Sequence, residues 1–146
     1  VKTADFASVK DLPMTILDYA GVAHPGTAFG ERDIKPPTGL SIRPWLEGEA
    51  ESPRPADVWH AFELFGNSYI VRGDFKASRV RTGMYGDGAW HLYNIRNDPG
   101  ETTPLDEARP DLLAELIAFY KKWAEETGII EVRDDWSPWF GFPEDR

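Results

Sequence analysis

The stretch WHLYNIRNDPGETTPL, which runs from Trp90 to Leu105, decides the fold that this sequence predicts. In its first part, at 90–95, successive side chains point to opposite faces, with the two-residue period of a β-strand. The strand ends in a turn at 97–100, where Pro99 presets φ at the first corner and Gly100 can take a positive φ at the second. A long amphipathic helix follows. The stretch therefore predicts a last strand that turns sharply into a helix covering its own sheet.

Upstream, three further runs predict strands at 57–65, 68–72 and 75–80, with a fourth at 89–95. Tight turns at Gly66-Asn67 and Gly73-Asp74 join them, so the strands form an antiparallel meander. The first run is apolar on both faces and is predicted to be buried. The helix is predicted at 110–127, between Pro110 and Gly128. The predicted class is α+β, a four-stranded antiparallel sheet packed by one long C-terminal helix. The helix residues expected in the core are Leu113, Leu116, Ile117 and Tyr120.

The first 56 residues predict a different organisation, a short helix followed by a long irregular loop. The helix spans 11–20, with Ser8 or Asp11 as its cap and Gly21 as its stop. Its apolar stripe is narrow, so it must pack on something, either this domain's own core or a partner in other sequence. The loop at 22–56 is rich in proline and glycine and wraps over a surface. Ile42, Trp45 and Leu46 could form one helical turn in it.

The tail at 131–146 carries aromatic residues between acidic residues and prolines. Exposed together, these side chains would form a large apolar patch. They are expected to bury against this domain, a second copy or another domain, which makes self-association an expectation. The aromatic residues are Trp136, Trp139, Phe140 and Phe142.

Composition excludes several classes of function. The chain has 146 residues with six tryptophans and a formal net charge of -9, which argues against nucleic acids and anionic membranes as partners. It has no cysteine, which excludes disulfides, thiolate metal sites and cysteine nucleophiles. No apolar run reaches membrane-spanning length, and no signal peptide is recognised. Because the first residue is Val1, we expect either a start inside a longer gene product or a removed leader.

The residues alone predict no active site, neither catalytic, cofactor-binding nor metal-binding. His24, His60 and His91 lie in a loop and two strands without metal-ligand spacing, and are interpreted as ordinary hydrogen-bonded side chains. No Gly-x-Ser-x-Gly elbow or calcium-loop spacing occurs. The carboxylates at 125–126 and 134–135 are interpreted as solvated surface. The glycines at 83, 86 and 88 lack the strand-then-helix setting of a phosphate loop, and predict a hairpin loop.

Five segments, taken in order, resemble the C-terminal region of the sulfatase family. SVKDLPMTILDYAG at 8–21 is similar to a family helix, although Met14 stands where the family has proline and Pro13 comes one place early. The others cover most of the chain to about residue 130, and the branch looks like bacterial arylsulfatases. They are GLS followed by WLEG within 39–48, FELFG at 62–66, VRGDFK at 71–76 and DPGET at 98–102.

The resemblance implies a C-terminal part of an arylsulfatase-like sulfuric ester hydrolase. Residues 1–56 would be the end of the larger domain and a wrapping loop, 57–130 the C-terminal subdomain, and 131–146 an aromatic tail. The family uses calcium and a formylglycine made in a C/S-x-P-S-R motif, which this chain lacks. No catalytic residue carries over, and the chain alone is expected to be inactive. Two classes remain open: a part that completes the enzyme and walls its substrate cleft beside the N-terminal catalytic domain, or a stand-alone binding module.

Overall fold

The computed structural model describes residues 3, 5–82, 85–130 and 132, and it divides the chain into two compact units, Val1–Ala56 and Asp57–Arg146. The aromatic residues of the predicted tail lie outside the described residues. Within the described ranges, no helix is both long and apolar enough to cross a membrane. Each unit is described by itself.

The first unit contains the predicted helix, α1 (Asp11–Ala20), which ends at Gly21 in the left-handed region. The loop that follows includes a small antiparallel hairpin, whose strands β1 (Ala28–Phe29) and β2 (Arg32–Asp33) have two residues each. A single turn, α2 (Arg43–Leu46), forms close to the predicted position. The capping prediction is only partly met, because no side chain caps the helix directly. Instead, the Asp11 carboxylate accepts a hydrogen bond from the backbone N–H of Ser8, at 2.8 Å.

Polar side chains of α1 hold the irregular segment of this unit in place. Asp11 is fully buried, accepts a hydrogen bond from the backbone of Leu40 at 2.9 Å, and forms a buried ion pair with Arg54. Thr15, also buried, accepts a hydrogen bond from the backbone of Ile42 at 3.1 Å. Long-range hydrogen bonds to buried helix side chains therefore order a loop that has few apolar residues of its own.

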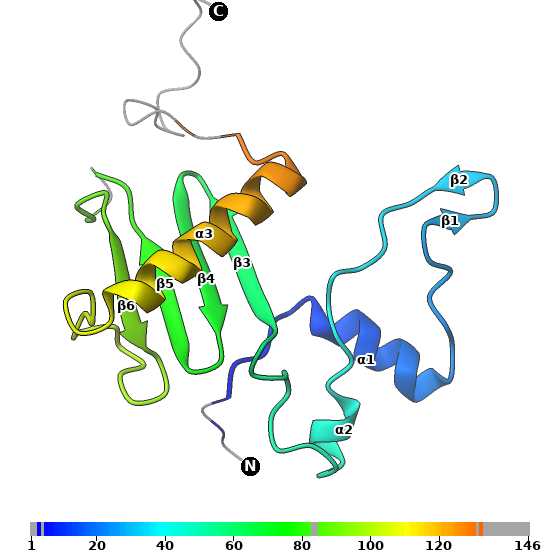
Figure 1. Cartoon of the computed structure of the whole chain (residues 1–146). Coiled ribbons are helices and arrows are strands. Elements are labelled where there is room, and N and C mark those ends of the chain that lie inside the picture. The colour runs from blue at the N-terminus through cyan, green and yellow to red at the C-terminus, as the bar shows by residue number, and fades with distance from the viewer. Residues whose placement is uncertain (1–2, 4, 83–84, 131, 133–146) are drawn as a thin grey trace, which may run out of the picture. The chain divides into compact units, whose positions relative to one another are not determined.

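The second unit is the predicted antiparallel sheet, in the order β3-β4-β5-β6. The strands are β3 (Trp59–Leu64), β4 (Asn67–Arg72), β5 (Phe75–Arg79) and β6 (Trp90–Asn94). α3 (Pro110–Thr127) crosses one face of this sheet, as Figure 1 shows. The α+β architecture and both limits of the long helix are thus confirmed.

The core lies between α3 and one cross-strand row of the sheet. Ala61, Ile70, Ala77 and Leu92 are direct neighbours in register, one from each strand. They pack with Leu116 and Tyr120, which are the buried residues of α3. The predicted core residue Leu113 is partly buried and packs against this core, whereas Ile117 is partly buried without belonging to the core cluster. The other partly buried residues of α3 that pack against the core are Leu112, Phe119, Trp123 and Ala124.

The first strand is an edge strand, and this corrects the prediction that it is buried on both faces. Phe62 and Leu64 of β3 are 42% and 51% exposed. The turn between β3 and β4 lies one residue earlier than the predicted Gly66-Asn67. It uses Phe65 and Gly66, with φ of 54° and 82°. An apolar run at a sheet edge has the same sequence pattern as a central strand, so the pattern alone cannot separate the two.

Candidate functional site

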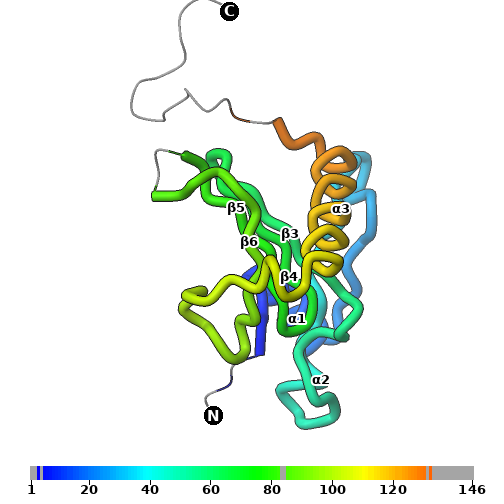
Figure 2. The backbone as a smooth tube through the Cα atoms, turned by 60° about the vertical axis from the view of Figure 1, so that its left-hand side comes forward, coloured from blue at the N-terminus to red at the C-terminus, as the bar shows by residue number. Residues whose placement is uncertain are grey.

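The sheet face turned away from α3, called here the distal face, carries polar and aromatic side chains from all four strands. Side chains alternate along each strand, so the neighbours of the core row point to this face. Figure 2 shows the sheet with α3 on one side and the connection that follows β6 on the other. The side chains of the distal face are His60 and Phe62 of β3, Tyr69 and Val71 of β4, Lys76 and Ser78 of β5, and His91 and Tyr93 of β6.

Lys76 and Glu101 form the ion pair at the centre of this face. The Lys76 ammonium donates to Oε1 of Glu101 at 2.6 Å, and the Ser78 hydroxyl donates to Oε2 of the same carboxylate at 3.3 Å. The Lys76 ammonium also lies 5.0 Å from the centroid of the Tyr69 ring, and the Phe62 ring stacks on the Tyr69 ring with the two centroids 5.4 Å apart. This part of the distal face therefore combines an aromatic ring pair, a hydroxyl group and the ion pair of Lys76 with Glu101.

The turn after β6 brings Glu101 to this position. The Asp98 carboxylate accepts hydrogen bonds from the backbone N–H groups of Thr102 and Thr103, each at 2.8 Å. The bond from Thr103 is the largest cause of the lowered pKa of Asp98. The left-handed residue of the turn is Glu101, with φ of 54°, and not Gly100 as predicted. The left-handed conformation that the sequence predicted at Gly100 is thus adopted by the next residue, Glu101, whose side chain makes the ion pair.

His91 joins two connections of the sheet. Its Nδ1 lies 2.7 Å from Oδ2 of Asp106, and its Nε2 lies 2.9 Å from Oδ2 of Asp87. Asp106 is fixed in turn, because its Oδ1 accepts a hydrogen bond from the backbone N–H of Leu92 at 2.7 Å. The hydrogen bond to Asp106, followed by the one to Asp87, raises the pKa of His91 against the opposing effect of burial.

The electrostatics of this corner are acidic. Burial raises the pKa of the Tyr93 hydroxyl, and the charges of Asp106, Glu101, Asp87 and Asp98 raise it further. The cations here, Lys76 and His91, each already face a carboxylate. Such a corner suits hydrogen bonding to neutral polar groups and disfavours an isolated sulfate anion.

The sequence predicted no catalytic or metal-binding residue, and the structure locates each histidine it considered. Nδ1 of His24 accepts a hydrogen bond from the backbone of Gly26 at 3.1 Å, and His60 lies 3.5 Å from the Tyr69 hydroxyl. Among residues 3, 5–82, 85–130 and 132, no three His, Asp or Glu side chains group so as to hold a metal ion. The bridge through His91 was missed, because Asp87 and Asp106 are four and fifteen residues away without any motif.

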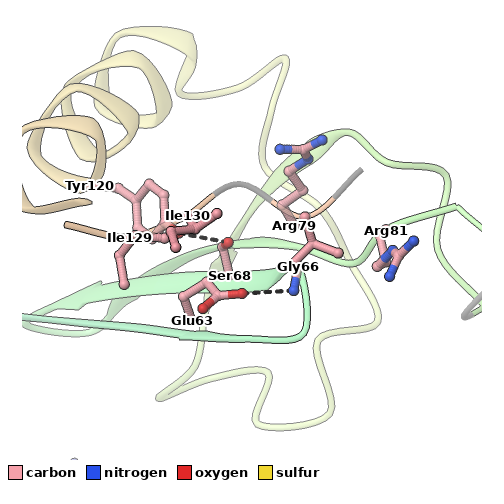
Figure 3. A pocket seen from close by; sticks show the side chains of 9 residues that line it. Glu63, Gly66, Ser68, Arg79, Arg81, Tyr120, Ile129 and Ile130 are labelled. Atoms are coloured by element: carbon pink, nitrogen blue, oxygen red, sulfur yellow. Dashed lines mark hydrogen bonds between the residues drawn. The ribbon is translucent and has the colours of Figure 1, made fainter. Parts of the chain in front are cut away.

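A second candidate is a pocket near the end of α3, drawn in Figure 3. Several of its polar groups are hydrogen-bonded within the pocket: the Ser68 and Tyr120 hydroxyls are 2.8 Å apart, and the Glu63 carboxylate accepts from the backbone N–H of Gly66 at 2.7 Å. These bonds give the pocket a structural role in closing the end of the sheet. It is lined by Glu63, Gly66, Ser68, Arg79, Arg81, Tyr120, Ile129, Ile130 and Val132.

Comparison with known proteins identifies relatives that match most of the chain. No protein-family profile matches it. An uncharacterized sulfatase of Schizosaccharomyces pombe (strain 972) is 36% identical over 134 residues, which are 90% of this chain and 23% of that protein. The chain therefore spans about a quarter of the length of this curated relative.

Solved structures share the fold. The crystal structure of Ps i-CgsB superposes with a TM-score of 0.62 and 21% identity, over 82% of this chain and 24% of that one. BT4656, solved with its substrate D-glucosamine-2-N,6-O-disulfate, superposes with a TM-score of 0.53 and 21% identity, over 87% of this chain and 25% of that one. In both, the matched part is a minor share of a larger chain.

Proposed function

We propose that this chain, a relative of the C-terminal region of the sulfatase family, serves as the C-terminal part of an arylsulfatase-like sulfuric ester hydrolase. In that role it completes the fold of a larger catalytic domain and walls one side of the substrate cleft. Calcium and formylglycine would be held by that domain. The residues that the structure describes offer no metal cluster, and the sequence contains no C/S-x-P-S-R segment in which formylglycine could form, so neither group is proposed for this chain.

The orientation of α1 is the observation that carries this proposal. Within its unit, α1 buries polar residues, Asp11 and Thr15, against the segment around Leu40. Leu12 and Ile16 are 52% and 66% exposed. An amphipathic helix normally buries its apolar stripe, and this supports the proposal that these side chains pack on the larger domain. Covering a Leu or Ile side chain contributes about 1.5–3 kcal/mol.

The distal face supports the second half of the proposal. The Phe62 ring is 42% exposed, and the partly buried side chains of Tyr69, Ser78 and Tyr93 lie on the same face. These groups can contact the uncharged part of a sulfate ester. Its acidic corner around Tyr93 would not hold the sulfate group itself. The cleft wall is therefore proposed to position the organic part of the ester, while the larger domain binds the sulfate.

A complementation experiment tests the proposal. The chain is produced alone and together with the upstream part of its gene product, and turnover of a chromogenic aryl sulfate is measured. The chain alone should show none, and the combination should be active. Leu12→Asp and Ile16→Asp should abolish complementation while leaving the far-UV circular dichroism and melting of the chain unchanged. Phe29→Asp, at a residue that is 69% exposed on β1, is the matched control.

Two outcomes would contradict the proposal. One is full complementation by Leu12→Asp, which would mean that α1 does not pack on the catalytic domain. The other is an upstream gene sequence without an in-frame C/S-x-P-S-R segment, which would favour the alternative of a stand-alone binding module derived from the fold.

A further inference from the structure

The bridge at His91 has a geometry that only one protonation state satisfies. A neutral imidazole has one N–H and one lone pair, so it can donate to only one acceptor. Here both ring nitrogens lie within hydrogen-bond distance of a carboxylate oxygen, 2.7 Å for Asp106 and 2.9 Å for Asp87. A neutral ring would direct a lone pair at one of these oxygens. The geometry therefore requires an imidazolium that donates from both nitrogens.

We propose that His91 is a pH-dependent latch between two connections of the sheet. As an imidazolium it binds Asp87 in the β5–β6 connection and Asp106 in the β6–α3 connection. When His91 loses its Nε2 proton, it releases Asp87. The two carboxylates differ in how firmly they are held. Each carboxylate also accepts one backbone hydrogen bond, Asp106 from Leu92 at 2.7 Å and Asp87 from Ala89 at 2.9 Å. The difference lies in exposure, because the Asp106 side chain is 29% exposed, whereas the Asp87 side chain is 62% exposed and can turn to water. Nδ1 therefore keeps its proton.

Other groups around His91 leave this assignment intact. Ser78 lies directly opposite it on β5, and its hydroxyl is already bonded to Glu101, which in turn pairs with Lys76. Tyr93 is two residues along β6, with its ring centroid 6.4 Å away. α3 covers the other face of the sheet. The elements packed around the ring thus present Asp87, Asp106, Glu101, Lys76 and Tyr93 as titratable groups, and carboxylates predominate, in agreement with the raised pKa of His91.

The test is a titration of the full chain, labelled with 15N in histidine, by long-range 1H–15N correlation between about pH 5 and pH 9. The His91 signals are identified by their loss in His91→Gln. Below the transition both ring nitrogens should be protonated. The midpoint should lie above about 6.5, the ordinary value for histidine. Above the transition Nδ1 should remain protonated and Nε2 should not.

Variants separate the two arms of the latch. Asp106→Asn and Asp87→Asn should each move the midpoint down, and Asp106→Asn should move it further. Glu126→Gln removes one carboxylate from the exposed part of α3 and is the matched control for long-range charge. If Asp106→Asn fails to fold, the wild-type tautomer and Asp87→Asn decide the matter. An Nε2–H tautomer at high pH, a midpoint at or below about 6.5, or equal shifts from Asp87→Asn and Glu126→Gln would overturn the latch.

Discussion

The ammonium of Lys76 donates a hydrogen bond to the carboxylate of Glu101 at 2.6 Å, across 25 residues of sequence. This contact joins the middle of β5 to the turn that leads into α3. It is made by a residue in the left-handed region, where a side chain costs about 1–2 kcal/mol. The ion pair with Lys76 therefore offsets the unfavourable backbone conformation of Glu101. The same ion pair holds the turn against the distal face.

Glu101→Gln should destabilise the chain by about 1–2 kcal/mol, since it leaves Lys76 partly buried without its charged acceptor. The loss would be measured by urea unfolding followed by tryptophan fluorescence. Glu126→Gln, which removes one end of an exposed 3.8 Å pair with Lys122, should change stability by less than about 0.5 kcal/mol. Equal effects of the two variants would mean that the central ion pair contributes nothing beyond a surface pair.

Gly39→Ala should disrupt the first unit. A β-carbon there would lie 1.8 Å from the carbonyl oxygen of Lys10, which is backbone and cannot turn aside. Overpacking of this kind costs about 1–3 kcal/mol or more. Gly26→Ala, where φ is +81° and nothing lies within 4 Å, should show only the backbone cost of about 1 kcal/mol. Hydrogen exchange of the α1 amides would compare them, and similar protection in both variants would refute the close approach.

The buried pair of Asp11 and Arg54 should show strong coupling in a double-mutant cycle. Asp11→Ala alone leaves a guanidinium that is 8% exposed without its partner, which costs about 3–5 kcal/mol. Arg54→Ala should cost a similar amount for the converse reason. The double variant should be much less destabilised than the sum of the two, as measured by chemical unfolding. Additive losses would show that the charges act independently.

Local signals made the sheet and α3 predictable. Pro110 and Gly128 bound the long helix, and glycine at 66 and 73 marked the hairpins. The limits of such reasoning appear where distant contacts decide the outcome. Phe62 and Leu64 are exposed because β3 lies at the sheet edge, and nothing in the local pattern records strand order.

The candidate site was far less predictable than the fold. The residues that meet on the distal face come from four strands and a turn. Lys76 and Glu101 lie in two of the segments that resemble the sulfatase family, at 71–76 and 98–102, but nothing in either segment indicates that the two side chains pair. Asp11 was expected only as a possible cap of the helix, and nothing was predicted for Thr15, yet both are buried and accept hydrogen bonds from the segment around Leu40. Polar residues acquire such roles only through tertiary partners, and these cannot be seen in spacing.

Leu116→Ala should lower the free energy of unfolding by about 2–5 kcal/mol, because the Leu116 side chain of α3 is fully buried against the core row of the sheet. Ile117→Ala should cost clearly less, since Ile117 is only half-buried. The sequence pattern assigned both to the core, so the pair tests the structure rather than the pattern. Thermal unfolding by circular dichroism would measure the difference, and equal losses would place both side chains in the core.

The stability of the chain should depend on pH through His91. A pKa that is raised in the folded state contributes stability fully below the unfolded value, near 6.5, and this contribution is lost as the pH rises through the folded pKa. On the acid side, this contribution depends on the Asp87 carboxylate staying charged. The pKa of Asp87 is lowered, first by the hydrogen bond from the Ala89 backbone and then by the hydrogen bond from His91. The difference in melting temperature between the wild type and His91→Gln should therefore be largest between about pH 4 and 6.5, and should shrink toward pH 9. Asp87→Asn should flatten this profile, whereas Glu126→Gln should preserve it. A difference that grows with pH would mean that His91 stabilises the fold as a neutral ring.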